Sequence, residues 1–247
     1  VDEHGVIVDA IRESMPAGRA LFTEATAEPY GAMFDSMLSN HWVAPDLVPA
    51  FPVVYGGKIP VFSLRIEFWS DDIVAFRQHI AQQLLWGVQL GWVDPFIVNG
   101  GWVPHAEMLR DTARLRAQVR PIFWEGEMRR PPALIGVNPS VARVWHYYNT
   151  TPLITTDSIM TSAWVDDMQQ HAVLFFVNVS DNAWSGSLRY DLGAEGLRGS
   201  QFLMRTRTPL DPGTTRPITG PILETSIEIP AGGLLAVDVQ SDDPGIE

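Results

Sequence analysis

The sequence predicts an α/β part followed by an all-β part: a partial (β/α) barrel segment and then an antiparallel β-sandwich. Up to about residue 130, stretches with apolar residues every three to four positions alternate with short apolar runs. After Arg129-Arg130-Pro131-Pro132, the pattern changes to short β-rich runs separated by turn residues. We therefore divide the chain into a barrel segment at residues 1–130 and a sandwich at residues 131–247.

The first elements of the barrel segment follow an alternating order. A helix-like stretch runs from Gly5 to Met15, and Pro16 follows it. A strand-like run from Ala20 to Thr23 comes next and leads directly to Glu24. We then expect a helix at Gly31–Leu38.

A second strand is predicted at Leu47–Tyr55, where two prolines confine regular pairing to part of the run. The longest helix follows Ser70-Asp71-Asp72, whose side chains can cap it. A further helix covers about Pro104–Arg120. Only two barrel strands are thus found, whereas a complete barrel has eight strands and typically about 250 residues. The order is that of the last quarter of a barrel.

The sandwich is predicted from eight short runs between turn residues, a spacing typical of antiparallel sheets. These runs are Val144–Asn149, Leu153–Thr156, Ile159–Val165, Ala172–Val179, Ser187–Leu192, Gln201–Arg205, Ile222–Ile229 and Leu234–Val239.

Composition excludes several classes of protein. The 17 basic against 29 acidic residues give a formal charge of −12, which disfavours binding to nucleic-acid phosphates. No apolar run is long enough to predict a membrane span, so we expect a soluble protein, cytoplasmic or secreted. The absence of cysteine leaves that choice open. The nine tryptophans suit thick aromatic cores or flat platforms for sugar stacking.

A family resemblance rests on four segments. GRALFTEATAEPY (Gly18 to Tyr30), LVPAFPVVYGG (Leu47 to Gly57), PLITTDSIMTSAW (Pro152 to Trp164) and AVLFFVNVSDNAW (Ala172 to Trp184) together resemble the C-terminal part of bacterial glycoside-hydrolase-like proteins. Those proteins join a (β/α)8 barrel to a C-terminal β-sandwich. The resemblance implies hydrolysis of O-glycosidic bonds. It also implies that the seventh and eighth barrel strands are present and that the first six lie outside this chain.

Glu24 is the predicted catalytic residue, because active groups of barrel enzymes lie at the C-terminal ends of strands. The resemblance implies a role as nucleophile or as general acid/base. A carboxylate that only pairs with a neighbouring loop is the alternative. Glu28 is expected to bind a sugar hydroxyl, and Tyr55 to contact substrate or orient Glu24, although a packed phenol is equally compatible with the sequence.

Further substrate-binding candidates flank the two later helices: Trp69, Trp92, Asp94 and Trp102. An exposed indole near a barrel mouth can stack on a sugar, whereas core packing is the commoner role of tryptophan. The six histidines show no HxH or HExxH spacing, which predicts no metal site and surface or capping roles. No P-loop or dinucleotide fingerprint occurs, so no cofactor is predicted.

The expected partner is therefore a carbohydrate substrate, with no nucleic acid and no membrane. Because two parallel strands cannot close a barrel, we also expect a homo-oligomer or a separate chain that supplies the missing strands. A non-catalytic carbohydrate-binding or structural module is the alternative to a glycosidase.

Overall fold

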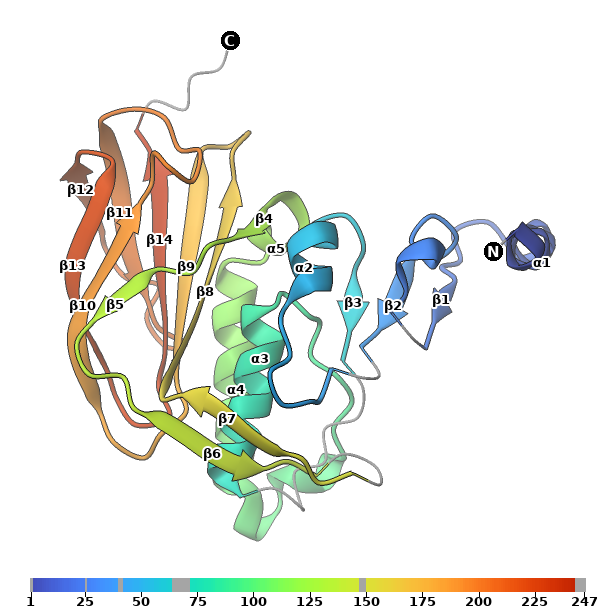
Figure 1. Cartoon of the computed structure of the whole chain (residues 1–247), viewed down its shortest axis with the longest axis horizontal. Coiled ribbons are helices and arrows are strands. Elements are labelled where there is room, and N and C mark those ends of the chain that lie inside the picture. Colours follow the sequence, from blue (N-terminus) through green and yellow to red (C-terminus); the bar gives the residue numbers. More distant parts are fainter. Residues whose placement is uncertain (1, 25, 40–41, 64–71, 147–149, 243–247) are drawn as a thin grey trace.

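The computed structural model describes residues 2–24, 26–39, 42–63, 72–146 and 150–242 (Figure 1). Its first part contains α1 (Asp2–Ser14), β1 (Phe22–Thr23), the 3-10 helix η1 (Glu28–Tyr30), β2 (Ser36–Leu38), α2 (Ala50–Tyr55), β3 (Val61–Phe62), α3 (Ile73–Leu85), the 3-10 helices η2 (Pro95–Val98) and η3 (Gly100–Trp102), α4 (Val103–Gln118) and α5 (Ile122–Glu125).

The second part is built from strands. They are β4 (Glu127–Arg129), β5 (Ala133–Ile135), β6 (Ser140–Val144), β7 (Leu153–Asp157), β8 (Ile159–Asp166), β9 (His171–Asn178), β10 (Trp184–Asp191), β11 (Gln201–Arg207), β12 (Thr215–Thr219), β13 (Ile222–Ile229) and β14 (Leu234–Ser241). A parallel β/α segment followed by antiparallel sheets confirms the predicted fold class.

The barrel segment contains a parallel sheet in the order β1-β2-β3. Phe62 of β3 also forms a parallel bridge with Gln89, so a fourth parallel segment extends the sheet. The sequence predicted only two barrel strands and missed β2, which lies within a predicted helix, and β3, for which no element was predicted. Between β3 and Gln89 the chain forms α3, and α4 follows, as expected for a β/α succession.

Two predicted elements are wrong. The run Leu47–Tyr55, predicted as a strand, forms the helix α2 at Ala50–Tyr55. Pro52 lies in the first turn of this helix, where backbone N–H groups have no partner within the helix and a missing donor costs little. The predicted helix Gly31–Leu38 instead ends in β2, whose three residues are all buried.

The sandwich consists of a six-stranded sheet, β12-β11-β14-β9-β8-β4, packed against a three-stranded sheet, β13-β10-β5. Seven of the eight predicted runs overlap strands that begin or end within a few residues of the prediction, among them β7–β11, β13 and β14. The eighth run, Val144–Asn149, meets β6 only at Val144, and residues 147–149 lie outside the described part. The edge strand β12 contains Pro217 and was not predicted.

Helix α3 joins the two parts, since Figure 1 shows the green helices α3 and α4 between the parallel strands and the sandwich. Its predicted cap is confirmed, since the Asp72 carboxylate accepts a hydrogen bond from Ala75 N at 2.8 Å. Its apolar face packs with α4 against the outer face of β8 and β9 in one buried cluster that includes Phe76, Leu84 and Phe175.

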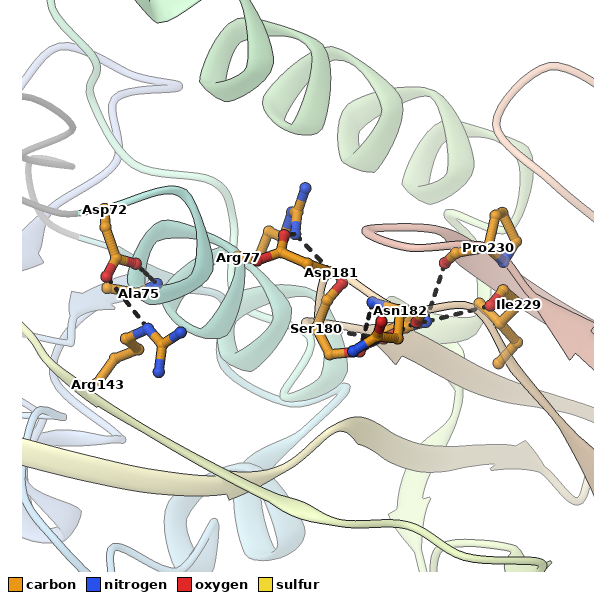
Figure 2. Close-up of polar contacts among 10 residues, drawn as sticks. Asp72, Ala75, Arg77, Arg143, Ser180, Asp181, Asn182, Ile229 and Pro230 are labelled. Carbon is orange, nitrogen blue, oxygen red and sulfur yellow. Dashed lines mark hydrogen bonds and ion pairs between the residues drawn. The ribbon is translucent and has the colours of Figure 1, made fainter.

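Charged and polar contacts fix α3 at both sides (Figure 2). Arg143 of β6 pairs with Asp72 at 3.2 Å, and Arg77 pairs with Asp181 in the β9–β10 loop at 2.7 Å. Asn178, which ends β9, donates to the carbonyl oxygens of Asn182 and Pro230 at 2.8 and 3.0 Å and so ties two sandwich loops together. Helix α3 is thus anchored to the hairpin β6–β7 and to the sandwich.

Trp164 fills the seam between the two parts. Its indole is 1% exposed, and its Nε1 donates to the carbonyl oxygen of Leu85 at 2.9 Å. Gly87, just after α3, has φ +69°, and a Cβ there would lie 2.6 Å from Trp164 Cζ2. Only glycine combines this backbone conformation with so close an approach.

We predict that Gly87→Ala lowers the free energy of unfolding by about 2–4 kcal/mol, because it adds a steric clash to left-handed backbone strain. Gly18→Ala is the control, since Gly18 has φ +79° but a Cβ added there would meet no atom within 4 Å. It should cost only about 1 kcal/mol of strain. Urea unfolding measures both, and equal losses would contradict tight packing at Trp164.

Candidate functional site

The C-terminal ends of the parallel segments bring together several residues distant in sequence. Glu24 follows β1, Ser39 follows β2, and Ser63 follows β3. Trp92 comes three residues after Gln89 of the fourth segment, and Asp94 two residues later. Carboxyl ends of parallel barrel strands meet at one edge, where active sites of this architecture are built. This edge is the candidate site.

Glu24 lies at the predicted kind of position, directly after a parallel strand, and its side chain is exposed. Neighbouring loop residues are held by local contacts. Thr26 Oγ1 accepts a hydrogen bond from Trp42 Nε1 at 3.1 Å, and the Trp42 ring lies 5.5 Å from that of Trp86 at the end of α3. Asp35, which precedes β2, accepts a hydrogen bond from Leu21 N at 2.7 Å. These contacts fix the chain on either side of Glu24.

Glu28 and Tyr55 contact each other, but Tyr55 does not directly follow a barrel strand. The hydrogen bond between the Tyr55 hydroxyl and the Glu28 carboxylate raises the pKa of Tyr55 above its usual value. Tyr55 ends the helix α2, and β3 begins only at Val61, so Tyr55 precedes a barrel strand instead of following one. The predicted position at a strand's C-terminal end is therefore wrong, because the strand assignment was wrong.

The remaining candidates fall into different environments. Trp92 is 63% exposed, whereas Trp102 is half-buried, with its ring 5.2 Å from that of His105. Asp94 caps η2 by accepting a hydrogen bond from Phe96 N at 2.9 Å. Trp69 lies outside the described residues. Trp92 thus has the exposed indole that a sugar-stacking role needs, and Trp102 contributes to packing.

Sequence reasoning missed a buried polar group beneath the strand ends. Ser39 and Ser63 line a cavity of about 20 Å³ together with His79, Gln82 and Gln83 of α3. A cavity of this size holds about one water molecule. The amide of Gln83 is buried and has no hydrogen-bond partner among the described residues, which suits such a water. The helical pattern places these polar positions outside the apolar stripe of α3 and so gives no signal that they are buried.

His79 corrects the expectation that the histidines have surface or capping roles. It is 9% exposed and stacks on Trp145 of the segment after β6, with ring centroids 4.9 Å apart. Burial lowers the pKa of His79 to about 4. The side chain is therefore a neutral imidazole at pH 7.

The low pKa of His79 predicts acid sensitivity. The folded pKa lies below the unfolded value of about 6.5, so the unfolded state takes up a proton on His79 before the folded state does. The free energy of unfolding is therefore unaffected by His79 above pH 6.5 and decreases as pH falls toward 4. We expect His79 to remove up to about 3 kcal/mol of stability over that range. Urea unfolding at pH 7 and pH 4.5 should show a smaller pH effect in His79→Gln. An unchanged pH effect would contradict a buried neutral His79.

In the ranges that the structure covers, no three His, Asp or Glu side chains gather as a metal site would require. Among the helices of those same ranges, none is long and apolar enough to cross a membrane.

No family model matches the chain. A curated protein of Bacteroides thetaiotaomicron described as "Putative glycoside hydrolase" is 27% identical over 167 residues, which cover 66% of this chain and 24% of that protein. The chain therefore spans about a quarter of the length of this relative.

Solved structures share the fold at low sequence identity. Alpha-galactosidase I from Mortierella vinacea matches with a TM-score of 0.52 and 10% identity, over 96% of this chain and 62% of that one. A GH27 β-L-arabinopyranosidase from Geobacillus stearothermophilus matches with a TM-score of 0.50 and 10% identity, over 99% and 55%. An alpha-amylase from Geobacillus thermoleovorans gives 0.50 and 10%, over 93% and 55%.

The chain is therefore glycoside-hydrolase-like, with the fold of a barrel part joined to a sandwich. It spans only 55–62% of the length of these enzymes.

Proposed function

We propose that this chain contributes a catalytic carboxylate to the hydrolysis of O-glycosidic bonds, with Glu24 as that carboxylate. The observation that carries the proposal is the exposed position of Glu24 directly after a parallel strand, at the edge where barrel enzymes hold their active groups. The likeness to glycoside hydrolases supports the reaction class.

Glycoside hydrolysis uses two carboxyl groups on opposite sides of the scissile bond. In this proposal Glu24 is the nucleophile or the general acid/base, and its partner belongs to a strand that this chain does not contain. A separation of about 5 Å between the two carboxyl groups leads to retention of configuration, and about 6.5–9.5 Å to inversion. Trp92, at the fourth parallel segment, offers its exposed ring as a sugar platform.

The free edge of the parallel sheet supports completion by further β/α units. Within the described residues β1 pairs only with β2. The register places Phe22 and Phe62 on one face of the sheet, where they are 57% and 38% exposed. On the other face, an apolar groove of about 380 Å³ runs between α1 and β1, lined by residues such as Ile7 and Ile11.

We propose that a second copy of this chain or a separate chain covers this edge and supplies the remaining strands. Parallel strands are normally covered on both faces and paired on both edges. A complete site would then need both components.

The catalytic proposal predicts that, in the assembly that contains both components of the site, Glu24→Gln abolishes hydrolysis of aryl glycosides while the thermal transition stays unchanged, because the amide keeps the shape but cannot act as nucleophile or acid. Glu228→Gln, an exposed substitution on β13, is the matched control and should retain full activity. A panel of aryl glycosides measures the rates. Wild-type rates in Glu24→Gln would remove Glu24 from the site, and sugar binding without hydrolysis in the wild type would favour the non-catalytic module.

The completion proposal predicts concentration-dependent association of the chain with itself or with a co-purifying chain. Phe22→Asp should weaken association by at least about tenfold, since it places a charge on an apolar interface. Val137→Asp is the control, because Val137 is 83% exposed in the β5–β6 connection. Light scattering over a concentration series distinguishes the outcomes, and a well-folded wild type that stays monomeric without a partner would contradict association.

A further inference from the structure

A polar groove lies on the six-stranded sheet, separate from the parallel strands. Leu203, Arg205 and Arg207 of β11, Thr215 of β12, and Asp238 and Gln240 of β14 line a hollow of about 220 Å³. We name it the sandwich groove. It lies on the sheet face that α3 and α4 cover elsewhere, because Ala236, two residues from Asp238 along β14, belongs to the core shared with these helices. Where α3 and α4 no longer cover this sheet face, most of its residues are polar instead of apolar.

A fixed charge network forms one side of the sandwich groove. The Asp238 carboxylate accepts a hydrogen bond from Arg207 Nε at 2.7 Å and lies 2.7 Å from His171 Nε2. Burial would raise the pKa of Asp238, but the hydrogen bonds and charges of His171 and Arg207 outweigh it and lower the pKa below the usual value. Asp238 is therefore ionised and held in place. Arg207 Nε and Nη2 both contact Oδ2, whereas Oδ1 contacts His171 Nε2 and keeps a lone pair that can accept a hydrogen bond from a hydroxyl.

Arg205 forms the other side. It pairs across the strands with Asp238 in register, yet its Nε and Nη2 donate to the Thr215 hydroxyl at 3.1 and 2.7 Å. Among the described carboxylates none forms an ion pair with Arg205. The network of Asp238 and Arg207 is already neutral without His171, so Arg205 leaves the sandwich groove with excess positive charge on a chain of formal charge −12. A guanidinium matches the two oxygens of a carboxylate.

We propose that the sandwich groove binds a uronic acid residue of an acidic carbohydrate, with Arg205 on its carboxylate and Asp238 and Gln240 on its ring hydroxyls. This inference rests on the proposed carbohydrate function. The exposed Leu203, 38% accessible, faces the apolar side of the ring. The hollow is smaller than the roughly 300–1,000 Å³ of sites for drug-sized ligands, which suits a single sugar ring. The fixed Asp238 favours a ligand with one carboxylate among several hydroxyls over a purely acidic ligand.

Calorimetric titration with tri-galacturonate tests the proposal on the whole chain. Saturable binding is expected, and Arg205→Gln should weaken it by at least about tenfold, because a charge-assisted pair is lost. Arg205→Lys keeps the charge without the planar fork and should fall between the two. Arg189→Gln, an exposed arginine on β10 of the other sheet, is the matched control and should bind like the wild type.

Two further ligands distinguish recognition of a uronic acid from recognition of a neutral sugar or of a carboxylate alone. Neutral galactotriose should bind at least about tenfold more weakly than tri-galacturonate, and a tri-glutamate peptide should not compete. Equal binding of the peptide, equal loss in Arg189→Gln, or no saturable binding by the wild type would overturn the proposal. If Arg205→Gln does not fold, NMR of the wild type during the titration decides whether the ligand binds in the sandwich groove. Chemical-shift changes of backbone amides should then be confined to β11, β12 and β14.

Binding at the sandwich groove and hydrolysis at Glu24 can be tested separately. Glu24→Gln should bind tri-galacturonate like the wild type, because Glu24 belongs to the parallel strands. Binding without hydrolysis would contradict only the catalytic role, and hydrolysis without binding at the sandwich groove would contradict only the present inference.

Discussion

Burial of one face of the six-stranded sheet beneath α3 and α4 is the constraint on which the rest of the structure depends. Phe76 and Leu84 of α3 share a buried cluster with Trp164 and Phe175 of the sandwich. Trp164 also requires close backbone approach, because a Cβ at Gly56 or Gly87 would lie less than 3 Å from its ring. Helices α3 and α4 are thus a structural layer of the sandwich.

The candidate site depends on this shared layer. Helix α3 connects β3 to the fourth parallel segment at Gln89, so its anchoring sets the positions of the strand ends. Arg116 of α4 donates to the carbonyl oxygen of Gly87 at 3.0 Å and stacks over Phe123 at 4.3 Å, which fixes the turn after α3. The parallel sheet is thereby supported on the side of Gln89, opposite β1, by the packed helices α3 and α4. Such a support suits an edge that positions functional side chains.

Sequence reasoning succeeded where an element is long or where a capping residue marks its boundary. Asp72 identified the start of α3, and the alternation of apolar residues identified most sandwich strands. It failed for β2 and β3, whose few residues lack the flanking apolar run that preceded Glu24. It also failed at α2, where the β-branched run Val53-Val54 outweighed the helix-compatible Pro52. Glu24 was placed correctly after a strand because Ala20–Thr23 precedes it, whereas Tyr55 inherited the error in α2. The burial of His79 depends on Trp145, which is distant in sequence, and has no local signal.

Native-state hydrogen exchange of the whole chain tests the shared core most directly. If α3 and the sandwich form one buried layer, the slowest amides of α3 and of β9 open together, with opening free energies that agree within about 1 kcal/mol. Destabilisation by low urea should then lower both to the same extent. Exchange of α3 through a separate, much easier opening, while β9 keeps its full protection, would contradict the account.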